Sequence, residues 1–155
     1  MGAIGEQLAS RFEASNTELI TRVESMTDSE WAHPTAVEGW PAGVTAHHVA
    51  EAAASLTGLV QTVAQGGQLP PITMDMLNAG NAEHALRAAN VTREETAALL
   101  RTNGEAAAKM LRSLSDEEFA RTGVLPAMGA PMSAQQFAEN VLIGHMNMHG
   151  ANIKG

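Results

Sequence analysis

The sequence contains no cysteine and no tyrosine, and it has only three phenylalanines and two tryptophans among its 155 residues. The lack of cysteine excludes disulfide bonds, thiolate metal ligands and a cysteine nucleophile. The scarcity of aromatic side chains leaves no platform on which nucleic-acid bases would stack. Whatever chemistry the chain performs must therefore use other side chains.

Positive charge is also scarce, with 9 Lys and Arg against 17 Asp and Glu and a formal net charge of -8. Binding to nucleic acid needs a basic surface that displaces counterions from phosphates, so we expect no nucleic-acid partner. No apolar run approaches the ~18 residues that a membrane span requires. The opening segment MGAIGEQLASRFEAS is too polar for a signal peptide. We therefore expect a cytoplasmic location and no membrane partner.

The residues that are abundant favour helices. Alanine is frequent, runs of β-branched residues are few, and the length suits a single domain over residues 1–155. Apolar side chains recur every three or four residues between Ile4 and Met26, which predicts an amphipathic helix. The remaining sequence predicts three further long helices, at residues 42–65, 92–113 and 133–152.

The connections between these helices differ in length. The segment AHPTAVEGWPAG and the segment GVLPAMGAPM, which precedes the last helix, are both expected to be loops. Residues 73–90 are expected to form a shorter helical piece interrupted near Gly80. We therefore predict an all-α four-helix bundle with long loops between helices one and two and between helices three and four. A short extra helical segment would precede helix three.

The sequence also carries an internal repeat. SMTDSEWA at residues 25–32 matches SLSDEEFA at residues 113–120, and each copy follows a long helix and precedes a loop and another helix. Two such halves would give the bundle an approximate two-fold symmetry. The alternative is that two capped helix starts resemble each other by convergence.

Two histidines lie four residues apart in the last predicted helix. Phe137, Val141, His145 and His149 are spaced by four residues and stay on one helix face, which the two apolar residues mark as the core. Both imidazoles could then reach one metal ion. The simpler alternative is a pair of ordinary hydrogen-bonded core residues.

The doublet His47-His48 lies near the start of the second long helix, where adjacent side chains point about 100° apart. His48 falls on the apolar side of this helix and His47 on the more polar side. If the second and last long helices are antiparallel, His48 meets the other two imidazoles at one end of the bundle. Three imidazoles with an open position are typical of a catalytic metal site.

The other candidates near these histidines are less informative. His33 lies in a loop and is expected at the surface, and Met146 and Met148 are expected to be packing residues. In LNAGNAEHALRAA, we expect Asn81 and His84 to lie on a solvated helix face, with a pocket-lining role as the alternative.

Three segments resemble one known family. EGWPAGVTAHHVAEAA resembles the start of the second helix in the DinB/YfiT-like superfamily of metalloenzymes, where a Gly-Trp pair precedes a ligand histidine. Here Trp40 precedes His48 by eight residues. GHMNMHGANI is similar to the family's final His-x-x-x-His, and LRSLSDEEF is similar to the end of its third helix. The resemblance covers essentially the whole chain.

The resemblance implies a four-helix bundle, often a homodimer, that binds a divalent ion, nickel or zinc. The ligands that it implies are His48, His145 and His149. Candidates for side chains around this site or in a substrate pocket are Glu51, Trp40, Asn81 and His84. The family includes thiol-dependent S-transferases and, as an N-terminal domain, part of a mycothiol-dependent maleylpyruvate isomerase.

Three functions remain open from the sequence. The first is a metal-dependent S-transferase that joins a low-molecular-weight thiol to a small-molecule substrate, and the missing cysteine means that this thiol comes from outside. The second is a small metal-dependent hydrolase in which water is the nucleophile. The third is a non-catalytic helical ligand-binding or stress-response dimer with structural histidines. The chain ends six residues after His149, so we expect no contribution from the isomerase's further C-terminal domain.

Overall fold

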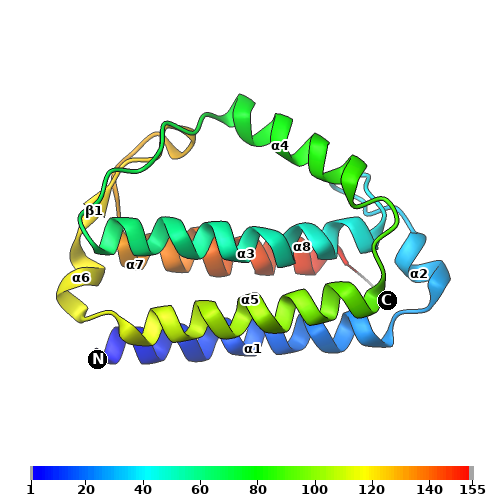
Figure 1. Ribbon diagram of the computed structural model, residues 1–155, viewed down its shortest axis with the longest axis horizontal. Helices are drawn as coiled ribbons and strands as arrows, with labels where there is room; N and C mark the ends of the chain where they lie inside the picture. Colours follow the sequence, from blue (N-terminus) through cyan, green and yellow to red (C-terminus); the bar gives the residue numbers. More distant parts are fainter. Residues whose placement is uncertain (1, 154–155) are drawn as a thin grey trace.

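The computed structural model describes residues 2–153 and consists mainly of helices. Four long helical runs form the bundle, with α1 beside α5 and α3 beside the last run (Figure 1). The helices are α1 (Ala3–Ser25), α2 (Asp28–Ala32), α3 (Ala42–Ala64), α4 (Met74–Arg87), α5 (Arg93–Ser113), α6 (Asp116–Ala120), α7 (Ala134–Gln136), η2 (Phe137–Ile143) and α8 (Gly144–Asn152). The predicted all-α four-helix bundle is confirmed, as is the extra helical segment, α4, before the third long helix.

The direction of the helices decides which of their ends meet. In Figure 1, α1 and α8 run in one direction, whereas α3 and α5 run in the other. The first turns of α3 and the last turns of α8 therefore lie at the same end of the bundle. This is the antiparallel arrangement that a shared histidine site requires.

The core is apolar and draws on every long helix. Its largest fully buried side chains are Phe12, Phe119, Phe137, Leu8, Leu100, Leu111, Leu125, Leu142 and Ile153. On the surface, Arg112 of α5 pairs with Glu6 at 2.8 Å and with Glu13 at 2.6 Å, both on α1. Exposed ion pairs contribute only about 0.2–1 kcal/mol each. The buried apolar contacts therefore supply most of the stability of the bundle.

The two copies of the repeat fold alike. Thr27 with Glu30 and Ser115 with Glu118 form capping boxes, and the five-residue helices α2 and α6 follow them. An isolated bridge then joins Pro34 to Pro41 in the first half. In the second half, β1 (Thr122–Gly123) pairs antiparallel with β2 (Met132–Ser133). The shared order of elements supports two related halves over convergence.

One local prediction was wrong, and two segments contain detail that was not predicted. Helix α4 continues through Gly80, because an exposed glycine costs a helix only about 1 kcal/mol. The segment GVLPAMGAPM, predicted as a loop, contains the 3-10 turn η1 (Pro126–Met128), and its end residues Gly123 and Met132 belong to β1 and β2. The last helix is not uniform, since η2 is a π-helical segment in which the Gly144 N–H bonds to the Glu139 carbonyl. Segments of this kind often lie beside functional sites.

Among residues 2–153, no helix combines the length and the apolar character needed to cross a lipid bilayer.

Candidate metal centre

Three imidazoles converge where the start of α3 meets the end of α8. His48 Nε2 lies 3.0 Å from His145 Nε2, and the ring centroids of His48 and His149 are 5.0 Å apart. The rings of His145 and His149 are 4.4 Å apart, as their spacing of four residues on α8 predicts. One nitrogen from each ring lies within 4.8 Å of the others. The geometry expected from helix phase is therefore present.

Glu38 orients one of these imidazoles, and the sequence reasoning missed it. Its Oε1 lies 2.7 Å from His149 Nδ1 and accepts a hydrogen bond from Asn152 Nδ2 at 3.1 Å. The turn that presents Glu38 closes through Gly39, whose φ of 74° favours glycine and whose N–H bonds to the Thr35 carbonyl. A carboxylate behind a ligand histidine fixes its tautomer and raises its basicity. The available signal was its position just before the Gly-Trp pair.

Two of the three imidazoles, those of His48 and His145, are held in the neutral form by their surroundings. Burial, helped by the neighbouring His149, lowers the pKa of His48 to about 4 and that of His145 to about 3. The pKa of Glu38 is also lowered, because hydrogen bonds from the backbone, His149 and other neighbours outweigh the opposing effect of burial. Metal ions bind deprotonated imidazole, so near neutral pH no proton has to be removed from His48 or His145.

The donor set fits a divalent transition metal. Three imidazoles with an open position suit zinc or nickel, whereas magnesium and calcium prefer oxygen ligands. The carboxylate of Glu38 lies behind His149, the position that a carboxylate often takes in histidine metal sites. Trp40 packs edge-on against His48, with ring centroids 5.6 Å apart, and so restricts the orientation of that ring.

A cavity of about 610 Å³ opens onto the three imidazoles. Helices α3, α4 and α8 supply most of its wall, and Met128 and Val141 complete it. Its apolar part includes Leu56, Leu77 and Met148. This volume is within the usual range of about 300–1,000 Å³ for small-molecule sites.

A second group of polar side chains lies on the wall of this cavity. His84 of α4 is only 4% exposed, and its Nε2 lies 2.8 Å from Nδ1 of His47 on α3. Glu51 of α3 lies beside both rings and forms a 3.0 Å ion pair with Arg87 of α4. Burial lowers the pKa of His47 and of His84, although the charge of Glu51 opposes this effect.

The structure therefore corrects part of the sequence interpretation. The expectation that His84 lies on a solvated face was wrong, because α4 folds back over α3 and buries it against the cavity. Asn81 also lines the cavity, as the alternative interpretation had it. Met146 is a core residue, but Met148 is 58% exposed and lines the cavity. His33 is exposed, as expected.

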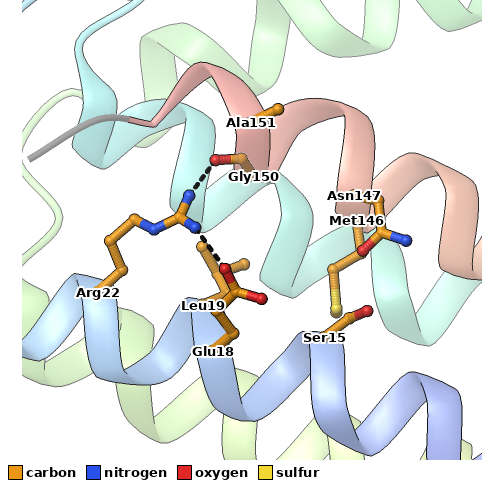
Figure 2. Close-up of a pocket in the computed structure, with 8 residues that line it drawn as sticks. All are labelled: Ser15, Glu18, Leu19, Arg22, Met146, Asn147, Gly150 and Ala151. Atoms are coloured by element: carbon orange, nitrogen blue, oxygen red, sulfur yellow. Dashed lines mark hydrogen bonds and ion pairs between the residues drawn. The ribbon is translucent and has the colours of Figure 1, made fainter.

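A smaller cavity of about 200 Å³ lies between α1 and α8, and no histidine lines it (Figure 2). Arg22 of α1 reaches across it to the Gly150 carbonyl and also donates to the Ile153 carbonyl at 3.0 Å. Lys and Arg side chains often bind the unpaired carbonyls at a helix end. Arg22 thus anchors the end of α8 immediately after His149.

Comparisons with known proteins agree with this architecture. A mycothiol-dependent maleylpyruvate isomerase is similar in structure with a TM-score of 0.76 and 14% sequence identity, and the match covers 97% of this chain. This chain spans 61% of that isomerase, so about two fifths of the isomerase lies outside the match. A variant of the same isomerase matches with a TM-score of 0.77. At these identities the similarity shows the fold alone.

A second similar structure is YfiT from Bacillus subtilis, described as a probable metal-dependent hydrolase with an unusual four-helix bundle topology. Its TM-score is 0.77 at 20% identity, over 96% of this chain and 83% of YfiT. No curated protein sequence matches the chain. The family model of the DinB superfamily matches residues 11–153. The chain belongs to the DinB superfamily.

Proposed function

We propose that this protein is a metal-dependent enzyme in which His48, His145 and His149 hold a divalent zinc or nickel ion. The observation that carries the proposal is the convergence of three imidazoles at the inner wall of a 610 Å³ cavity. Glu38 keeps His149 in the tautomer that presents Nε2 to the ion. Near neutral pH, His48 and His145 remain unprotonated because burial lowers their pKa values.

The proposed reaction is the transfer of a low-molecular-weight thiol to a small electrophile. A divalent ion at an open three-imidazole site lowers the pKa of a bound thiol or water and so supplies a nucleophile near neutral pH. The chain contributes no thiol of its own, because it has no cysteine. The mycothiol dependence of a structurally similar isomerase supports an external thiol.

In this proposal the side chains that line the cavity have separate roles. Leu56, Leu77 and Met148 would hold the apolar part of an electrophile. Asn81, which also lines the cavity, would bind polar groups of the substrate. Glu51 and Arg87 form a mutual ion pair at the cavity wall, where a charged substrate group could separate them.

The test is a coupling assay with metal-loaded, untagged protein, a chromogenic electrophile and a panel of bacterial low-molecular-weight thiols. We expect a rate above that of free thiol, and we expect His145→Ala to abolish it while the exposed control His33→Ala retains it. A rate no higher than that of free thiol with every thiol would contradict the proposal.

A metal-dependent hydrolase is the second candidate, favoured by the similarity to YfiT over 83% of that chain. The same protein is offered ester and amide substrates without thiol. Turnover that needs the metal but no thiol would support this candidate and exclude the transferase. Ligand binding without turnover of either kind would support a non-catalytic binding protein.

A further inference from the structure

Outside the three-histidine site, a second set of metal-binding side chains converges on one point. His47 and Glu51 lie four residues apart on α3 and therefore share a helix face. His84 approaches them from α4. The Oε2 atom of Glu51 lies 3.9 Å from His47 Nδ1 and 3.9 Å from His84 Nε2. One ligand atom from each of the three residues lies within 4.8 Å of the other two.

The spacing of these atoms resembles that in the three-histidine site. Ligand atoms about 2.0–2.1 Å from a tetrahedral ion are roughly 3.3 Å from each other. The contact between His47 and His84 is 2.8 Å, and the corresponding contact between His48 and His145 is 3.0 Å. In each cluster this closest pair of nitrogens would separate by a few tenths of an ångström to hold an ion. Glu51 Oε2, now 3.9 Å from each imidazole nitrogen, would move inward by about 0.6 Å.

The alternative is that these residues form only a hydrogen bond and an ion pair. However, the carboxylate of Glu51 divides its two oxygens, since Oε1 contacts Arg87 at 3.0 Å and Oε2 faces the imidazoles. Arg87 therefore leaves one oxygen of Glu51 available, and its side chain is 54% exposed and free to move into solvent.

The environment of His84 also permits metal binding. Its Nδ1 is buried and has no hydrogen-bond partner among residues 2–153. No donor in this part of the chain points at Nδ1, so nothing there opposes the tautomer with the proton on Nδ1, which an ion bound at Nε2 requires. A buried imidazole with one unpartnered nitrogen is uncommon in a purely structural role.

We propose that His47, Glu51 and His84 form a second divalent-metal site, on the same cavity as the three-histidine site. Two imidazoles and one carboxylate are a donor set used for zinc, and they leave a position open. Glu51 and His84 line the cavity together with His48, whose ring lies 5.5 Å from that of His84. An ion there would be placed to bind an anionic group of a molecule in the cavity. This inference does not depend on thiol chemistry.

The test is the number of Zn²⁺ ions that untagged, metal-stripped protein binds, measured by native mass spectrometry and calorimetric titration. We expect two ions for the wild type. Glu51→Gln should lose one ion or bind it at least tenfold more weakly. The control Glu83→Gln should retain two, because Glu83 lines the cavity but lies outside both clusters. Glu51 is 43% exposed, so this change leaves the core intact.

A double variant, His145→Ala with His149→Ala, separates the two sites. It removes two ligands of the first site, and we expect it to bind a single ion that the further change Glu51→Gln abolishes. The proposal is overturned if the wild type binds no ion, or if Glu51→Gln binds as many ions as the wild type and as tightly. Loss of the first site alone would contradict the proposed function and leave this one standing.

Discussion

At the scale of single residues, the sequence pattern identified candidate metal ligands that lie on one helix. His145 and His149 were predictable because their spacing of four residues holds within the regular helix α8. Glu38 was not predictable in the same way, since a fold-dependent contact across 111 positions brings it to His149. The sequence placed His47 only on a polar helix face. Its contact with His84 could not be predicted, because it depends on how α4 packs against α3.

The first prediction concerns Glu38. Replacing Glu38 with Gln keeps the shape of the side chain but removes its charge, so His149 becomes a weaker ligand. We expect metal affinity to fall about 10–100-fold with an unchanged fold, as for other partners of ligand histidines. Competition with a chromogenic chelator measures this affinity. The control Glu105→Gln changes an exposed carboxylate on α5, and an equal loss there would contradict the role of Glu38.

At the scale of elements, capping signals were reliable and backbone irregularities were not. The capping boxes at Thr27, Thr92, Ser115 and Ser133 all begin helices in the structure, because a cap needs only residues three positions apart. The π-helical segment η2 and the pairing of β1 with β2 depend on contacts with distant parts of the chain. These elements left no signal that local spacing could detect.

The second prediction compares two glycines of α3. A Cβ atom at Gly43 would lie 2.3 Å from the ring of Trp31, whose Nε1 donates a hydrogen bond to the Val91 carbonyl at 3.0 Å. Gly43→Ala must displace this packed ring, and we expect it to lower the free energy of unfolding by about 1–3 kcal/mol. Nothing lies within 4 Å of a Cβ at Gly58. Gly58→Ala should therefore stabilise the protein by about 0.4–1 kcal/mol.

Urea unfolding followed by circular dichroism compares the two variants. The midpoint should fall for Gly43→Ala and rise for Gly58→Ala. If both variants shift in the same direction, the close packing of Trp31 against the start of α3 is not what requires glycine at position 43.

At the scale of the whole molecule, the sequence predicted the all-α bundle. It did not predict the directions of the helices, and the antiparallel arrangement was only the condition under which the three histidines would meet. Amphipathic spacing and capping define the long helices, and four such helices have few ways to share one core. The course of α4 over α3 was not predictable, because its sequence alone does not show which face it covers. That helix buries His84 and completes the cavity.

The third prediction concerns stability and pH in the metal-free protein. The folded pKa values of His48 and His145, about 4 and about 3, lie below that of an unfolded histidine. Below about pH 6.5 the unfolded chain therefore binds more protons than the folded one. We expect stability to fall as the pH drops from about 6.5 to about 3, by a few kcal/mol in total. His145→Leu should show a smaller fall, and a fall equal to that of the wild type in urea titrations would contradict this account.

The most direct test of the central claim is the metal content of untagged protein. Elemental analysis of the wild type and of His48→Ala, purified side by side, measures the ions that each chain retains. The account predicts at least one zinc or nickel ion per wild-type chain and one ion fewer in His48→Ala, with both proteins equally helical. Equal metal content in the two proteins, or well below one ion per wild-type chain, would contradict a metal site at His48, His145 and His149.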